Sequence, residues 1–138
     1  LEYNARFGDP EAQVVLPRLR GDLLEILMAC VDQRLHEAKI EWEDNAAVCV
    51  VLASGGYPVA YEKGYPISGL EQFQDLENMV VFHAGTAKKQ DRVVTYGGRV
   101  LGVTGIGNTL DEAIQTAYEG VEKIHFEKKH YRKDIGIK

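Results

Sequence analysis

Hydrophobic residues recur at helical spacing in the first third of the chain. From residue 23 onward the apolar positions lie three or four residues apart, at Leu23, Leu27, Cys30 or Val31 and Leu35. This spacing predicts a helix over residues 23–35, which follows Gly21 and has Asp22 as its N-cap. We expect this helix to pack on two sides, because three further apolar side chains lie off the stripe, namely Leu24, Ile26 and Met28.

A second helical pattern lies near the C-terminus. Thr109 and Glu112 have the spacing of a capping box, in which two side chains satisfy free backbone N–H groups at a helix start. After them the apolar residues form one stripe, at Leu110, Ile114, Ala117, Val121 and Ile124. We expect this stripe to lie across a β-sheet, and the basic segment from residue 125 to residue 138 to be mostly irregular.

Between these helices the pattern changes to short apolar runs of strand length. They cover residues 46–53, 80–84, 92–96 and 99–104. Residues 88–91 are predicted to connect the second and third runs in a hairpin, and Gly97-Gly98 to form the turn before the fourth. Successive short strands favour an antiparallel sheet. The sequence therefore predicts an α+β fold, in which a small antiparallel sheet has flanking helices.

The N-terminal stretch changes direction at a glycine. Residues 1–8 are predicted to form a strand, and residues 10–19 a short helix with Asp9 as its N-cap and Pro10 in its first turn. Gly8 permits a tight turn between them. A turn that leads into a helix start presents backbone N–H groups to an anion.

The same stretch carries the candidate metal ligands. On a strand, Glu2, Asn4 and Arg6 leave the same face. A carboxylate and an amide oxygen are ligand types that Mg²⁺ accepts, and a guanidinium matches a phosphate or a carboxylate. Exposed strands also alternate polar and apolar residues without any such role, so the pattern alone leaves both interpretations open.

Composition and charge limit the class of function. The 138 residues are enough for one compact domain with a core, but not for two. A net charge of −5 argues against a nucleic-acid partner, because phosphate binding needs a basic face. No apolar stretch approaches the roughly 20 residues of a membrane span. Cys30 and Cys49 stand in apolar settings, so we expect buried free thiols and a cytoplasmic location.

The stretch EYNARFGDPEAQ at residues 2–13 is followed by four others, at residues 53–58, 82–86, 97–101 and 131–136. These five stretches resemble, in the same order, the phosphoribosylamine–glycine ligase family of ATP-grasp enzymes, and the first resembles the closing signature of that family. The resemblance covers essentially the whole chain. It implies that residues 1–20 are the last strand and helix of an ATP-grasp domain, and that residues 21–138 are a C-terminal α+β domain. The chain then reads as the C-terminal piece of a larger protein.

The resemblance also implies an activity. Members of the family use ATP to phosphorylate the carboxylate of glycine, and the amine of 5-phosphoribosylamine attacks the acyl phosphate to give glycinamide ribonucleotide, ADP and phosphate. For this chain it implies that Glu2 and Asn4 bind Mg²⁺ or Mn²⁺ and that Arg6 is a catalytic residue. We expect the N-terminal remainder of the same protein to be a required partner and the isolated chain to be inactive.

Substrate contacts are expected at two turns. Gly8 and Asp9 form one; Gly98 and Arg99 form the other, where glycine brings the backbone close to a ligand and the arginine fork matches a ribose phosphate. An ordinary hairpin turn with a solvated arginine explains Gly98 and Arg99 equally well. His83, within an apolar strand, is either a core residue or a wall of the glycine or ribose pocket.

Two other functions stay open at this point. One is a sister ATP-grasp ligase with a different carboxylate or amine substrate. The other is a non-catalytic binding or carrier module, in which a lysine at an exposed hairpin tip would hold a prosthetic group. Lys88 and Lys89 are the only candidates for that lysine, and they lack flanking methionines.

Overall fold

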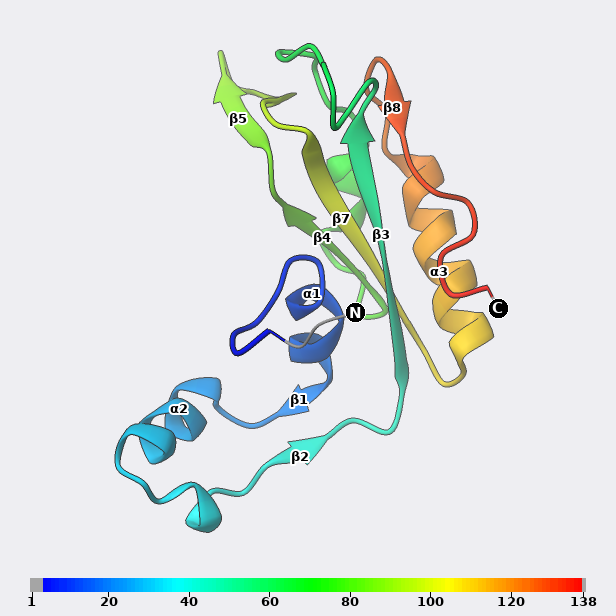
Figure 1. The fold of residues 1–138 in the computed structure, drawn as a ribbon. Coiled ribbons are helices and arrows are strands. Elements are labelled where there is room, and N and C mark those ends of the chain that lie inside the picture. Colours follow the sequence, from blue (N-terminus) through cyan, green and yellow to red (C-terminus); the bar gives the residue numbers. More distant parts are fainter. Residues whose placement is uncertain (1–3, 138) are drawn as a thin grey trace.

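The computed structural model describes residues 4–137 and centres on a four-stranded antiparallel sheet. The two long strands, β3 and β7, pair from Ala46 opposite Gly107 to Leu52 opposite Leu101 (Figure 1). The antiparallel sheet expected from the sequence is thus confirmed. In the order β4-β7-β3-β8 the strands are β4 (Met79–His83), β7 (Arg99–Gly107), β3 (Ala46–Ser54) and β8 (Lys129–His130).

Two smaller antiparallel pairs flank this sheet. They are β1 (Leu19–Arg20) with β2 (Glu41–Trp42), and β5 (Thr86–Lys89) with β6 (Arg92–Thr95). The expected pairing of residues 80–84 with residues 92–96 was wrong, because β4 pairs with β7 instead. Gln90 and Asp91 adopt left-handed backbone angles, with φ of 47° and 61°, and form a tight turn that leaves Lys88 and Lys89 inside β5.

Helix α3 (Leu110–Lys123) covers one face of the sheet, as expected from its apolar stripe (Figure 1). Oγ1 of Thr109 accepts the backbone N–H of Glu112 at 3.2 Å, and the Glu112 carboxylate accepts the N–H of Asn108 at 2.8 Å. Burial of apolar surface between α3 and the sheet is the main stabilising contribution. The largest fully buried apolar side chains of this core are those of Val50, Leu52, Val100, Leu101, Val103, Val121 and Ile124.

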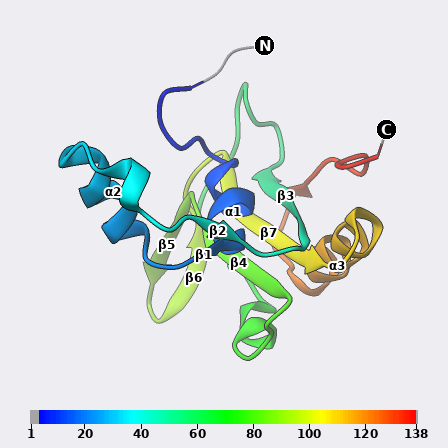
Figure 2. The same ribbon diagram turned by 90° about the horizontal axis from the view of Figure 1, so that it is seen from below.

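The short helix α1 (Ala12–Val15) contacts β3 and β7 on the face opposite α3 (Figure 2). A 3-10 turn over Leu16–Arg18 follows it, because Pro17 has no N–H to continue the α-helix. The expectation that Asp9 caps this helix was wrong, since the N-cap is Glu11 and makes no side-chain cap. The strand expected over residues 1–8 was wrong for residues 4–8, which form a bend, and residues 1–3 lie outside the described part.

Helix α2 (Leu23–Val31) projects away from the sheet together with β1 and β2 (Figures 1 and 2). The Asp22 carboxylate caps it as expected, by accepting the N–H of Leu24 at 2.7 Å. The helix ends at Val31 rather than at residue 35, because Gln33 takes a left-handed conformation with φ of 58°. Ala29 is its one buried residue, so the expected packing on two sides is not seen within residues 4–137. None of the described helices has the length and apolar character needed to cross a bilayer.

Candidate functional site

The turn of residues 4–11 places the first predicted site residues on the surface. Asn4 and Arg6 are both exposed, and Nη1 of Arg6 donates to the main-chain oxygen of Phe7 at 3.1 Å. The shared strand face expected for Asn4 and Arg6 is not present, because this segment bends. Glu2 lies outside the described residues. Asn4 and Arg6 are therefore near neighbours on one exposed turn rather than successive positions on a strand.

The second predicted turn meets the first. Nη1 of Arg99 donates to the main-chain oxygen of Asp9 at 2.7 Å, and Nη2 lies 3.3 Å from Oδ2 of the same residue. Arg99 begins β7 and Asp9 precedes α1, so folding joins two turns that are remote in sequence. The structure therefore brings together Asp9 and Arg99, which the sequence predicts as site residues at two separate turns.

Asp9 is also tied to helix α1 and, through it, to the central sheet. Its Oδ1 accepts a hydrogen bond from Nε2 of Gln13 at 2.9 Å, and the main-chain oxygen of Gln13 accepts one from the buried hydroxyl of Thr104 at 2.9 Å. Burial raises the pKa of the neighbouring Cys49 thiol; a hydrogen bond with Thr104 opposes this rise, and the Asp9 charge adds to it. A small polar network thus lies under the N-terminal turn.

Gly98 makes its close contact within the chain. A Cβ at this position would overlap the ring of Tyr57. The turn is fixed further by Ser54, whose N–H donates to the oxygen of Gly98 at 2.8 Å and whose hydroxyl donates to the oxygen of Gly97 at 2.9 Å. Packing explains the glycine here, whereas a ligand contact at Gly98 stays a prediction.

His83 lies beside the same N-terminal turn, a relationship that the sequence pattern did not reveal. It shares an apolar crevice of about 560 Å³ with Gly8, Asp9, Leu16 and Phe82. Nδ1 of His83 lies 3.0 Å from Oγ1 of Thr86, and the side chain is exposed rather than buried in the core. The core interpretation of His83 was therefore wrong. The motif Phe82-His83 was the available signal, but nothing in it identified the turn that it would face.

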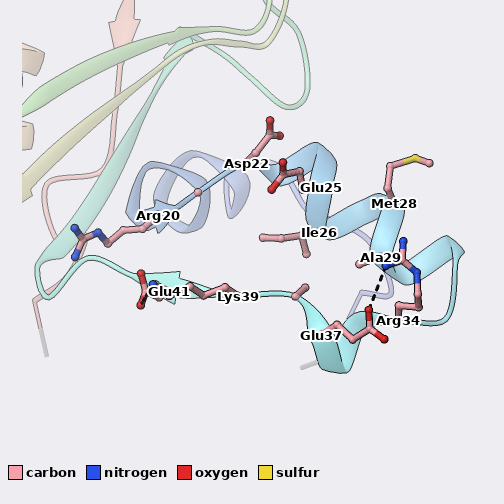
Figure 3. Close-up of a pocket in the computed structure, with 12 residues that line it drawn as sticks. Arg20, Asp22, Glu25, Ile26, Met28, Ala29, Arg34, Glu37, Lys39 and Glu41 are labelled. Carbon is pink, nitrogen blue, oxygen red and sulfur yellow. Dashed lines mark hydrogen bonds and ion pairs between the residues drawn. The ribbon is translucent and has the colours of Figure 1, made fainter.

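A larger hollow than this crevice lies elsewhere, between α2 and the β1–β2 pair. It has a volume of about 740 Å³ and is lined by both signs of charge. Figure 3 shows Ile26 pointing from α2 toward the segment with Lys39, while Arg34 and Glu37 form an ion pair at 3.2 Å. None of the predicted site residues lines this hollow, so it is distinct from the site built around Asp9.

The described residues contain only part of the metal site expected from the sequence. Across residues 4–137 no group of three or more His, Cys, Asp or Glu side chains is arranged to hold a metal ion. Asn4 is the one predicted metal ligand within residues 4–137, and the predicted carboxylate ligand, Glu2, is not described. The donor types fit Mg²⁺, which takes one or two carboxylates and otherwise keeps water or substrate oxygens.

Comparisons with known proteins identify the relatives of this fold. The family model described as phosphoribosylglycinamide synthetase, C domain, matches residues 47–138. A phosphoribosylamine–glycine ligase of Synechocystis is 54% identical over 139 aligned positions, covering 100% of this chain and 33% of that protein. The trifunctional purine biosynthetic protein adenosine-3 of Gallus gallus is 52% identical, covering 100% of this chain and 14% of that protein.

A solved structure agrees with these relationships. The crystal structure of phosphoribosylamine–glycine ligase from Thermotoga maritima is 42% identical and superposes with a TM-score of 0.73, covering 97% of this chain and 32% of that one. The chain thus spans about a third of the length of these single-function relatives. The sequence resemblance is confirmed, and the chain belongs to the phosphoribosylamine–glycine ligase family, whose C-terminal domain it contains.

Proposed function

We propose that this chain is the C-terminal part of an ATP-dependent ligase that joins glycine to 5-phosphoribosylamine in purine biosynthesis. The relationship to phosphoribosylamine–glycine ligases along the whole chain carries this proposal. It favours this ligase over a sister ATP-grasp enzyme with another substrate. The position of Lys88 disfavours a carrier module. This lysine lies in β5 and pairs with Asp91 at 3.1 Å rather than standing alone at a hairpin tip.

The residues of the N-terminal turn have defined roles in this reaction. Arg6, exposed on the turn, offsets charge on the phosphoryl group during its transfer to the glycine carboxylate. Asn4 and Glu2 would hold Mg²⁺ or Mn²⁺, which when bound shields the charge of the ATP phosphates. The sequence predicts substrate contacts at Gly8 and Asp9 on this turn and at Gly98 and Arg99 where β7 begins; of these four, Gly8 and Gly98 are kept here as proposed substrate contacts. Catalysis of this kind depends on positioning and electrostatics, without a covalent enzyme intermediate.

The packing also suggests how the chain divides. Residues 1–20 are proposed to end an ATP-grasp domain, as the sequence predicts. Residues 21–45, which the sequence assigns to the C-terminal domain, project from its sheet, and their helix α2 buries only Ala29. The family model begins at residue 47, which is the second residue of β3. We therefore place residues 21–45 with the ATP-grasp domain and begin the C-terminal domain at β3.

The partner that completes this function is the N-terminal remainder of the same protein, in the cytoplasm. That part would supply the adenine pocket and any further metal ligand. Substrate and phosphate charges would then meet at the turn of residues 4–11, which lies on the surface of this chain. The isolated chain is expected to bind no ATP productively and to be inactive.

A ligase assay tests the proposal directly. ADP formation by the full-length protein should require both glycine and 5-phosphoribosylamine, and the isolated chain should show none. Asn4→Ala in the full-length protein should lower kcat by about 100-fold, because the phosphate charge is then poorly shielded. Lys88→Ala, a surface change in β5, is the matched control and should retain full activity. Turnover by the isolated chain, or an equal rate with another carboxylic acid, would contradict the proposal.

A further inference from the structure

One guanidinium holds both the backbone and the side chain of Asp9. Arg99 donates to the main-chain oxygen at 2.7 Å and approaches the carboxylate at 3.3 Å. A planar fork with two contacts fixes orientation as well as distance, which a single lysine contact does not. The two contacts therefore fix the position and orientation of the turn before α1 relative to the start of β7.

The opposite side of Asp9 is held by a second chain of contacts. Gln13 donates to the other carboxylate oxygen, and the Gln13 main chain accepts the hydroxyl of Thr104, which is 0% exposed. Thr104 lies in β7, as does Arg99. Strand β7 thus holds Asp9 directly, through Arg99 at its beginning, and indirectly, through the contact of Thr104 with Gln13 in α1.

The turn held in this way carries the proposed catalytic residue. Arg6 is three residues before Asp9, and a chain of that length reaches at most about 11 Å. The position of Asp9 therefore limits where Arg6 can lie. Misplacement of a reacting group by about 1 Å can lower a rate by about 100-fold. The contacts that fix Asp9 thus affect kcat even if Arg99 never touches the substrate.

We propose that Arg99 is a positioning residue, which acts through Asp9 to hold the turn carrying Arg6 against the C-terminal sheet. The proposal rests on the proposed function, because Arg6 has its role only in that reaction. It differs from direct binding of the substrate phosphate by Arg99. A lost phosphate contact raises the KM for 5-phosphoribosylamine, whereas a displaced turn lowers kcat.

A double-mutant cycle in the full-length protein separates these roles. Arg99→Ala and Asp9→Asn should each lower kcat by about tenfold or more, with the KM for 5-phosphoribosylamine changed less than about twofold. The double variant should be no worse than the poorer single variant, since Asp9→Asn weakens the carboxylate contact, which is one of the two contacts that Arg99→Ala removes. Arg99→Lys should recover little activity, because an ammonium cannot make the two-pronged contact.

The matched control removes a pair of the same chemistry elsewhere. Arg132→Ala breaks the exposed contact between Arg132 and Asp134, at 2.7 Å, and should leave kcat and KM unchanged. A rise of about tenfold in the KM for 5-phosphoribosylamine in Arg99→Ala with kcat retained, or single effects that multiply in the double variant, would overturn the positioning role.

Hydrogen exchange in the full-length protein gives a readout that needs no activity. The N–H of Ala12 donates to the oxygen of Gly8 at 3.0 Å, so a peptide over residues 8–15 reports on the turn. Its exchange should be about tenfold faster in Arg99→Ala and unchanged in Arg132→Ala. If the wild-type protein is no glycine ligase, the proposed function fails, but hydrogen exchange still tests whether Arg99 fixes the turn at Asp9. Unchanged exchange in Arg99→Ala overturns the positioning role, whatever the activity.

Discussion

The ring of Tyr57 occupies the space that a Cβ on Gly98 would need. This contact joins the loop after β3 to the turn before β7, and the two hydrogen bonds from Ser54 hold the turn in the same place. Glycine at position 98 is thus required by packing within the chain. A ligand at this turn would have to approach from a side that Tyr57 does not cover.

The Tyr57–Gly98 contact predicts a stability change. Gly98→Ala should lower the free energy of unfolding of this chain by about 1–3 kcal/mol, because the added methyl group forces the ring or the turn to move. Urea unfolding followed by circular dichroism measures the change. The same substitution in a Tyr57→Ala background is the control and should cost clearly less, since the space is then free. An equal loss in both backgrounds would show that packing against Tyr57 is not the reason for this glycine.

The carboxylate of Glu62 joins the loop after β3 to the segment before β8. Lys128 is the main cause of a lowered pKa of Glu62, and the Tyr65 hydroxyl adds to it by a second hydrogen bond. Because the folded-state pKa lies below its ordinary value of 4.5, this contact stabilises the fold above that pH. Its contribution is lost as the pH falls through the lowered pKa.

A titration of Glu62 by NMR tests this contact. The midpoint of its side-chain carboxyl signal should lie below 4.5 in the wild-type chain and move up toward that value in Lys128→Asn. Asparagine suits the left-handed backbone of residue 128, which has φ of 60°. Lys133→Asn, a lysine in the same tail, should leave the midpoint where it is. A midpoint that Lys128→Asn does not move would refute the assigned cause.

The two cysteines differ in accessibility. The sequence led us to expect two buried thiols, but Cys30 is exposed, because α2 covers no core within the described chain. Burial raises the pKa of the Cys49 thiol, so less of it is the reactive thiolate near neutral pH. In the isolated chain, iodoacetamide should modify Cys30 at least about tenfold faster than Cys49, as followed by mass spectrometry. Cys30→Ser should abolish the fast phase, and comparable rates at both thiols would count against the described packing of Cys49.

The sequence predicted those elements whose signals are local. Asp22 and Thr109 cap their helices as expected, because a cap depends on residues within one turn. The pairing of β4 with β7 was not predicted, since a short apolar run specifies a strand but not its partner. Helix α1 is shorter than the helix predicted over residues 10–19, because Pro17 has no backbone N–H to continue it. That effect is local and can be predicted from the sequence.

For the candidate site, too, the sequence predicted individual residues but not the contacts between them. Residue chemistry selected Asp9 and Arg99, each from its own turn, but spacing holds no information on which turns meet in the fold. Their contact joins residues 90 positions apart. The apolar crevice beside His83 forms only when the N-terminal turn lies against β4, so its significance was likewise outside the reach of a linear pattern.

Helix α2 presents apolar side chains to solvent in this chain. Leu24 is 64% exposed and Val31 is 76% exposed. An exposed apolar cluster of this kind commonly marks a surface that another part of a protein covers. If residues 21–45 belong with the ATP-grasp domain, as proposed, that domain covers this face in the full-length protein. Substitutions on α2 should therefore have different effects on the two forms.

Replacing Leu24 and Val31 together by glutamine tests this assignment. The isolated chain should change in stability by less than about 0.5 kcal/mol, as surface substitutions usually do. The full-length protein should lose about 2–4 kcal/mol, because two buried apolar groups become polar. Leu52→Ala, in a core residue that is 0% exposed, is the control and should destabilise both forms by about 2–5 kcal/mol. If the full-length protein tolerates the glutamines as well as the isolated chain does, α2 is uncovered in both forms. The ATP-grasp domain would then end at residue 20, as the sequence predicts.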